Sequence, residues 1–530
     1  PQAELAQALL DLADAEHRGG HHGEAVVAGE RASRLAEAVG RTDLMAAAAL
    51  VAPWVSFPAA TEALTRLCRV ALVQETDLDL ATRSRLRSKL VVLTVERSWP
   101  EAGETAATAM DLAVRSADPE ALLDAAGAAI TVLPECDVAG RRLGLADLAI
   151  AEATRLDRRM GLAIALTWRL RAAVELGRAD LVEECLERLT AVAEASGAPL
   201  AHWHAIRARA SVAVLRGDFT LVPDLNARAT TIAGRSGDVV AMGMSYASAR
   251  HVDEVRWVAG PGLEETLVVM AAAPPSPLMD TGRGLELLRA GRREEAEAAY
   301  RRVVPLVGTS PSTRPWMPAV QQLITLAEAF DDHALAPALV TELVPGAQLE
   351  GGVGISTAYF TGSVSRDLGR ALALAGRAEE AVVELRRSIA RNTRLGALPD
   401  VALGRLDLAR VLARHSTGPV AREQAGVALD LATTAAEELR RLDMTGHLPG
   451  AAALVAELRG ILAAVDPLSS REREVVDLVV AGRTNREIAD RLVLSERTVE
   501  SHVRSALMKR GCRNRAELIR AESAETGPLA

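Results

Sequence analysis

Lysine is almost absent from this chain of 530 residues. Of its 61 lysines and arginines, only Lys89 and Lys509 are lysines. A phosphate-cradling loop of the G-x-x-x-x-G-K-[ST] type needs a lysine directly after a glycine. Lys89 follows a serine and Lys509 follows a methionine, so neither can belong to such a loop. The sequence therefore excludes this nucleotide-binding motif, and the predominance of arginine is typical of high-GC coding.

Aromatic residues and cysteines are also scarce. Aromatics make up 2% of the chain against 49% hydrophobic residues, which indicates globular cores built from Ala, Leu and Val and suits close helix packing. The four cysteines, Cys68, Cys136, Cys185 and Cys512, stand far apart without a CxxC pair. This spacing excludes a disulfide framework and favours a reducing cytoplasm.

No membrane-spanning segment or signal peptide is expected. The longest uncharged stretch, from Leu44 to Thr61, is interrupted by Pro53 and Pro58, and no signal peptide pattern opens the chain. The sequence therefore predicts a cytoplasmic protein without membrane partners. It begins at Pro1 rather than at a methionine, which leaves a longer parent protein open.

Residues that could form a catalytic or metal site do not cluster. His21 and His22 fall in a predicted turn, and His202 and His204 are two apart on a predicted helix, where their side chains point in different directions. The glycine-rich run 351–356 has no predicted strand before it, as a phosphate loop requires. We therefore expect no enzyme activity, no cofactor and no metal, and the six tryptophans are predicted to lie in helix cores.

Residues 3–459 alternate Ala/Leu-rich segments of helical period with short polar breaks, which predicts an all-α arm. A glycine-led turn before a helix recurs at Gly20, Gly177, Gly217, Gly291 and Gly376. The gaps are 157, 40, 74 and 85 residues, each close to a multiple of 40. Such spacing is typical of stacked helical hairpins.

The clearest repeat unit is 374–390, LAGRAEEAVVELRRSIA, which resembles the tetratricopeptide pattern, although the aromatic consensus positions are mostly missing. A degenerate tetratricopeptide-like α-solenoid is therefore expected over residues 1–449, with a concave surface for a protein or small-molecule effector. Proline-rich breaks at 273–277, 309–315 and 345–362 predict loops or seams between parts of the array.

Capping patterns predict four short helices in residues 467–523. Ser469 with Glu472, Thr484 with Glu487 and Asn514 with Glu517 each match a capping box, and Ser495 caps without one. Gly482 and Gly511 stand where helix ends favour positive φ. Only residues 493–495 separate the second and third helices, which predicts a helix-turn-helix.

The third predicted helix is amphipathic in the way that a recognition helix requires, with a buried face and an opposite polar face that could enter a major groove. Its apolar side carries Val499, Val503, Ala506 and Leu507, and its polar side carries Arg497, Glu500, Ser501, Arg504 and Met508. If the helix were considered in isolation, the simpler interpretation would be that its polar face is only exposed to solvent. The surrounding caps and the short turn favour DNA binding instead.

The segments LSSREREV, GRTNREIA, LSERTVESHV and KRGCRNRAEL resemble the LuxR-type helix-turn-helix of bacterial transcription regulators. The resemblance implies base contacts from Glu500, Ser501 and Arg504. It also implies phosphate contacts from Thr484, Asn485, Arg486, Arg497, Thr498, His502 and Lys509. In this family two modules pair through the last helix, here residues 515–523.

One position departs from the family pattern. Arg510 stands where the family usually has leucine, on the buried stripe of its helix beside Val503 and Leu507. We expect its aliphatic stem to cover the core with the guanidinium outside. We expect this arginine to affect local stability or dimer packing more than the fold.

Charge separates the two parts of the chain. Residues 467–523 contain 12 Lys and Arg against 9 Asp and Glu, whereas the whole chain has a net charge of −9. Only the C-terminal module is therefore expected to approach DNA. The expected organisation is a helical arm over 1–449, a connecting helix over 450–466, a four-helix LuxR-type helix-turn-helix domain over 467–523 and a disordered tail over 524–530.

The resulting hypothesis is a bacterial transcriptional regulator that binds double-stranded DNA as a homodimer while the arm senses a signal or a partner. An alternative is a protein-interaction scaffold whose helix-turn-helix does not bind DNA. The chain resembles the C-terminal part of the large ATP-binding LuxR regulators without their ATPase domain. An NTP-driven switch could therefore belong only to a longer parent protein.

Overall fold

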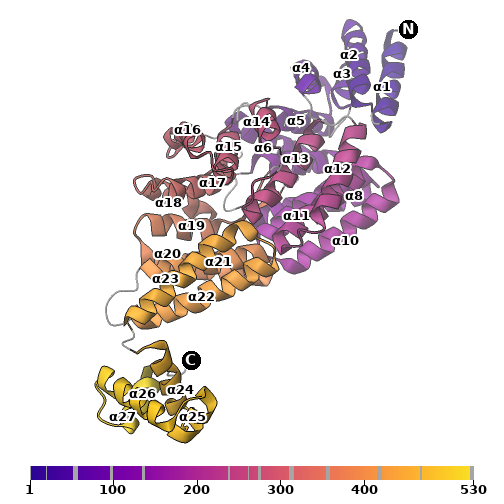
Figure 1. The fold of residues 1–530 in the computed structure, drawn as a ribbon. Helices are drawn as coiled ribbons and strands as arrows, with labels where there is room; N and C mark the ends of the chain where they lie inside the picture. The colour runs from indigo at the N-terminus through magenta and orange to yellow at the C-terminus, as the bar shows by residue number, and fades with distance from the viewer. Residues whose placement is uncertain are drawn as a thin grey trace. The chain divides into compact units, whose positions relative to one another are not determined.

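The computed structural model describes residues 2–525 except 20, 52–57, 96–98, 134–137, 237–238, 261, 273–275, 310–315, 354–358, 415–420 and 466–467. Within these residues the chain is almost entirely α-helical, as predicted (Figure 1). These residues also contain one sheet of two short strands. It forms two compact units, Pro1–Leu408 with Glu437–Leu448 and Ala409–Ala436 with Pro449–Ala530.

The first unit is an array of helices that pack in chain order. From α1 to α13 each helix contacts the next, and alternate helices such as α7, α9 and α11 also contact one another. This pattern is a two-layer stack of helical hairpins, which confirms the tetratricopeptide-like arm. Its first helices are α1 (Gln2–Arg18), α2 (His22–Ala38), α3 (Thr42–Ala49), α4 (Pro58–Val73), η1 (Glu75–Asp77), α5 (Leu80–Thr94), α6 (Trp99–Ser116), α7 (Pro119–Val132), α8 (Ala139–Arg155), α9 (Arg159–Glu175), α10 (Ala179–Ser196), α11 (Pro199–Arg216), α12 (Val222–Ser236) and α13 (Val239–Arg256).

The array continues with α14 (Leu263–Ala272), α15 (Pro277–Arg289), α16 (Arg293–Val303), η2 (Val304–Leu306), α17 (Trp316–Ala329), α18 (Ala336–Leu343), η3 (Val344–Gly346), α19 (Val364–Leu374) and α20 (Ala378–Leu395). The predicted turn glycines Gly177, Gly217, Gly291 and Gly376 have φ between 67° and 82°, a region that glycine adopts without strain. Each precedes a helix by a few residues. Gly20 lies outside the described residues.

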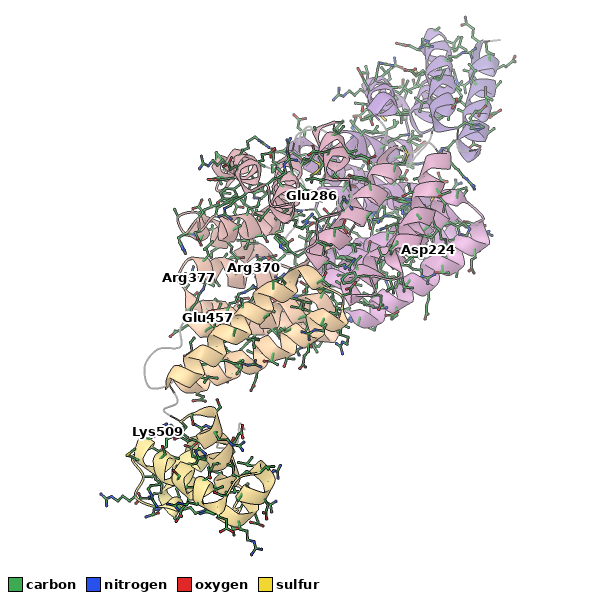
Figure 2. All side chains as sticks on the ribbon, in the orientation of Figure 1. Asp224, Glu286, Arg370, Arg377, Glu457 and Lys509 are labelled. Carbon is green, nitrogen blue, oxygen red and sulfur yellow. The ribbon has the colours of Figure 1, made fainter. Side chains whose placement is uncertain are left out.

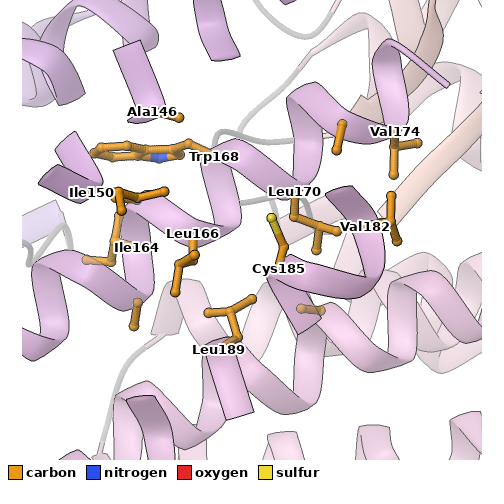
Figure 3. Close-up of a cluster of buried hydrophobic side chains, with 14 of the residues drawn as sticks. Ala146, Ile150, Ile164, Leu166, Trp168, Leu170, Val174, Val182, Cys185 and Leu189 are labelled. Atoms are coloured by element: carbon orange, nitrogen blue, oxygen red, sulfur yellow. The ribbon is translucent and has the colours of Figure 1, made fainter. Parts of the chain in front are cut away.

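One extensive core of the arm is rich in alanine and leucine and includes residues of α7 to α11. Trp168 lies in it with 3% exposure, among residues such as Ile164, Leu166 and Leu189 (Figure 3). A Cβ on Gly127 would come within 2.7 Å of the Trp168 ring, so the indole requires a glycine on the neighbouring helix. Trp168 and Trp203 are buried in helix cores as predicted, whereas Trp54 lies outside the described residues.

A β-hairpin that the sequence did not predict lies inside the arm. The stretch 345–362, expected as a loop, contains β1 (Glu350–Val353), which pairs antiparallel with β2 (Tyr359–Ser363) across a bulge at Gly351 and Gly352. β1 contacts α9, α17 and α19, and β2 contacts α11 and α13. Phe360 of β2 joins the core that contains Trp168. Gly351 and Gly352 therefore lie in a paired strand, and residues 354–356 of the glycine-rich run lie outside the described residues.

The helices that follow lead to the C-terminal module. They are α21 (Leu398–Arg414), α22 (Ala421–Arg441), η4 (Thr445–His447) and α23 (Leu448–Val465), and α23 occupies the stretch expected as a connecting helix. The module contains α24 (Ser470–Val480), α25 (Asn485–Leu492), α26 (Glu496–Lys509) and α27 (Arg515–Glu525). The last helix extends two residues into the segment expected as a disordered tail, and residues 526–530 lie outside the described residues.

Candidate nucleic-acid interface

Two capping boxes begin the first two helices of the module. The Glu472 backbone N–H donates to Ser469 Oγ over 3.3 Å, and the Ser469 N–H donates to the Glu472 carboxylate over 2.6 Å. Thr484 and Glu487 make the same reciprocal pair over 3.3 and 2.7 Å. Both predicted boxes are therefore confirmed, and hydrogen bonds from Thr484 lower the pKa of Glu487.

The caps of the last two helices differ in one detail from the prediction. The Thr498 N–H donates to Ser495 Oγ over 3.1 Å, as expected for a cap without a box. Asn514 Oδ1 accepts from the Glu517 N–H over 2.9 Å, but the Glu517 carboxylate accepts from the Arg513 N–H over 2.7 Å. The prediction of a third capping box was therefore wrong in one of its two hydrogen bonds. The Glu517 carboxylate accepts from the backbone N–H of Arg513 instead of that of Asn514.

The turn between α25 and α26 consists of residues 493–495, which confirms the helix-turn-helix arrangement. Gly482 and Gly511 have φ of 76° and 65°, as predicted for helix ends. Val493, which directly follows α25, has φ of 54°, although a β-branched residue is strained in this region. Its side chain is 90% exposed, so no packing compensates for the strain.

The inner face of α26 is buried in the module core, as the sequence predicted. Val499, Val503 and Ala506 are buried and Leu507 packs against them, together with residues of the other three helices. That core comprises Leu468, Val475, Val476, Val479, Ile488, Ala489, Val499, Val503, Ala506 and Leu518. The core thus holds α26 along its apolar stripe. Figure 1 shows the four short helices grouped together at the C-terminal end of the chain.

The outer face of α26 carries the residues predicted to contact bases. Arg497, Glu500, Ser501 and Arg504 are all exposed. Among the described residues, no hydrogen bond or ion pair engages any of these four side chains. One polar surface of the helix is thus available to a ligand, with Met508, 78% exposed, near its C-terminal end.

Some of the predicted phosphate-contacting residues already have partners within the module. Asn485 Oδ1 accepts from Arg515 over 3.0 Å, and the hydroxyl of Thr498 lies 2.7 Å from that of Ser495. Thr484 is engaged in its capping box, and His502 is half-buried. Arg486 and Arg497 are exposed, so the structure distinguishes free guanidinium groups from side chains that also serve the fold.

Lys509 is held by a glutamate that the sequence analysis assigned only to a cap. Glu472 accepts from Lys509 Nζ over 2.6 Å and from Ser505 Oγ over 2.5 Å, and these bonds join α24 to α26. Burial opposes ionisation of Glu472, but bonds from Lys509, Ser505 and Ser469 lower its pKa to about 2. Figure 2 shows Lys509 among the side chains of the module.

The guanidinium of Arg510 was expected to lie in solvent, and this prediction was wrong. Its side chain is 12% exposed, and its Nε lies 2.8 Å from the Glu522 carboxylate of α27. The same carboxylate lies 2.6 Å from Arg473 of α24. Glu522 shares the inner stripe of α27 with Leu518, one helical turn away, and this placement was the signal for a buried partner of Arg510.

Comparisons with known proteins identify the family. Residues 466–521 match the model described as bacterial regulatory proteins, luxR family. Over 52 residues the chain is 42% identical to the spore germination protein GerE of Bacillus subtilis, a match that covers 70% of that protein and 10% of this chain. The chain belongs to the LuxR family of bacterial regulatory proteins.

Two other relatives are longer than GerE, and the matched segment covers a smaller share of each. The chain is 44% identical over 70 residues to the DNA-binding transcriptional activator DevR/DosR of Mycobacterium tuberculosis, which is 13% of this chain and 32% of that protein. It is 40% identical over 74 residues to the transcriptional regulatory protein FixJ of Rhizobium meliloti, or 14% and 36%. This chain thus spans about a third of the length of these two relatives.

The chain has a distant structural neighbour. A chain of the APC/C hetero-tetramer Cut9-Hcn1 aligns with a TM-score of 0.45 and 13% identity, over 82% of this chain and 86% of that one.

Within the described residues, no group of three or more His, Cys, Asp or Glu side chains could hold a metal ion. None of the described helices is both long and apolar enough to cross a membrane.

Proposed function

We propose that this LuxR-family chain is a DNA-binding transcriptional regulator that places α26 in the major groove of double-stranded DNA. The observation that carries the proposal is the outer face of α26, where Glu500, Ser501 and Arg504 are exposed and engaged by no other described residue. Arg504 suits a guanine edge, and Glu500 suits the amino group of cytosine. Recognition of one short sequence follows from these three contacts.

Phosphate contacts would supply most of the affinity. The exposed guanidinium groups of Arg486 and Arg497 begin α25 and α26, where helix N-termini also attract anions. Thr484, Asn485, Thr498, His502 and Lys509 complete the proposed contact set. Asn485 and Lys509 would have to contact phosphate while still bonded to Arg515 and Glu472. Arg486 and Arg497 would therefore contribute more to the salt dependence of DNA binding.

The module would act as a homodimer, with α27 as the pairing helix. Ala516, Arg520 and Ala521 are exposed on α27, while Leu518 and Glu522 face the module core. Small exposed side chains allow two helices to approach closely, which supports pairing through this face. The helical-hairpin arm would bind the signal, whether a protein or a small molecule, on the surface of its stacked helices.

The test compares two arginine variants of the full chain on DNA selected from a randomised double-stranded pool. Arg504→Ala should relax the preference at one base position by about 1 to 3 kcal/mol, because a base contact is lost. Arg486→Ala should weaken binding to all sequences alike and reduce the salt slope by about 1, because only a phosphate contact is lost. Binding constants at several salt concentrations separate the two effects.

Two results would contradict the proposal. An unchanged base preference in Arg504→Ala would remove α26 as the recognition helix. If the chain showed no salt-dependent retention on DNA at all, the scaffold alternative would be favoured, in which the helix-turn-helix serves protein contacts only.

A further inference from the structure

Three charged side chains join three helices on the inner side of the C-terminal module. Glu522 of α27 lies between Arg473 of α24 and Arg510, the residue that caps the C-terminus of α26. The N···O distances are 2.6 and 2.8 Å, and the side-chain exposures are 8% for Glu522, 24% for Arg473 and 12% for Arg510. We call these three residues the Glu522 triad.

Arg510 stands where the resemblance to the LuxR type implies a leucine, so one member of the triad replaces an expected apolar side chain. A buried carboxylate between two guanidinium groups is stable only while the charges remain paired, because each charge loses its hydration when it is buried. Loss of one partner therefore disrupts such a site more than loss of an exposed ion pair does. The attachment of α27 at this point depends on charge pairing rather than on apolar contact alone.

The rest of α27 is attached to other parts of the module. Leu518 is fully buried in the core, and Arg515 at the start of the helix bonds to Asn485 over 3.0 Å and to the backbone of Arg483. The C-terminal half of α27 is held by Glu522, which also contacts the residue that ends α26. Glu522 therefore fixes the angle of α27 against the recognition helix.

We propose that Glu522 is a positioning residue that sets the spacing of two recognition helices on DNA. The inference rests on the proposed function, in which two modules pair through α27. If α27 changes its angle against α26, the distance between the two paired α26 helices changes as well. A dimer with a fixed α27 reads two half-sites at one separation, whereas a dimer with a loosened α27 accepts several.

The experiment uses the full chain and double-stranded DNA selected from a randomised pool, from which probes with one half-site and with two half-sites at varied spacing are made. Glu522→Gln should keep the half-site sequence and the affinity for one half-site. It should lower the affinity for two half-sites by about tenfold or more and broaden the accepted spacing.

A matched control changes the same charge at another place on the module. Glu474 of α24 is 50% exposed and pairs with Arg471 alone among the described residues, so Glu474→Gln should leave the spacing preference unchanged. The triple variant with Arg473→Leu, Arg510→Leu and Glu522→Leu replaces the whole triad by apolar side chains, so that neither arginine is left without the Glu522 carboxylate. It should restore both the narrow spacing and the affinity for two half-sites.

Three outcomes would overturn the inference. The first is an unchanged spacing preference in Glu522→Gln, and the second is an equal loss of affinity for one and for two half-sites, as a merely structural role predicts. The third is a triple variant that hydrogen exchange shows to be folded but that still accepts several half-site spacings. If the wild-type chain selected no sequence from the pool, the proposed function itself would fail, which is a distinguishable result.

Discussion

Val493→Gly is expected to stabilise the helix-turn-helix, because it removes backbone strain from the turn. Three helices of the module end next to a residue in the left-handed region: Gly482 after α24, Val493 after α25 and Gly511 after α26, with φ of 76°, 54° and 65°. Two of the three are glycines. Val493 alone places a branched Cβ where it crowds the following carbonyl oxygen.

The magnitude follows from three contributions. Left-handed backbone costs a residue with a side chain about 1 to 2 kcal/mol, which the change to glycine relieves. Glycine loses more conformational entropy on folding, which offsets about 0.5 to 1 kcal/mol of that gain. Because Val493 is 90% exposed, almost no packing is lost. The net stabilisation is about 0.5 to 1 kcal/mol, or a two- to fivefold change in the local opening equilibrium.

Hydrogen exchange of the full chain measures this effect locally, because exchange of amides in α25 and α26 reports the opening of the module. Val493→Gly should slow their exchange by about two- to fivefold. Gly482→Ala is the matched control, since a Cβ there meets no atom within 4 Å and adds only the left-handed strain. It should accelerate exchange by about as much.

A contrary result would refute the strain argument. If Val493→Gly left exchange unchanged or faster while Gly482→Ala behaved as expected, the valine would have to stabilise the turn in a way that its exposure does not show.

Two further variants test the helical arm. Gly127→Ala should destabilise the arm by about 1 to 3 kcal/mol, because its Cβ would meet the Trp168 ring at 2.7 Å; thermal unfolding followed by tryptophan fluorescence would show the loss, and an unchanged midpoint would contradict the close contact. His204 is buried, and this burial, together with the charge of Arg207, lowers the pKa of its imidazole to about 4, so its contribution is fully present above about pH 6.5 and disappears as pH falls toward 4. Relative to His204→Phe, the wild type should therefore lose up to about 3 kcal/mol of unfolding free energy across that window, and a constant difference between the two proteins would be inconsistent with a buried neutral imidazole.

Elements that depend only on neighbouring residues could be predicted from the amino-acid sequence. The caps at Ser469, Thr484 and Ser495, the glycine at each of two helix ends and the apolar stripe of α26 involve residues only a few positions apart. Local hydrogen bonding and helical period are sufficient to specify such features. The exposed face of α26 could be predicted in the same way, because exposure follows from the opposite buried stripe.

The β-hairpin shows what local patterns could not specify. The residues Gly351 and Gly352 favour a loop, and β1 forms because it pairs with β2 and packs between helices that are far away in the sequence. Strand formation depends on this surrounding surface more than on intrinsic preference. Only the packed arm could therefore decide that this stretch is a strand.

The contacts that position the candidate interface were also decided by tertiary structure. Glu472 meets Lys509 at a separation of 37 residues, and Arg473 meets Glu522 at a separation of 49. Periodicity places each of these side chains on a face of its own helix, but the partner depends on how the helices pack. The sequence thus determined which residues lie on the exposed face of α26, while the packing of α24, α26 and α27 decided which charged side chains of the module are held by partners, because buried charges must find their partners across helices.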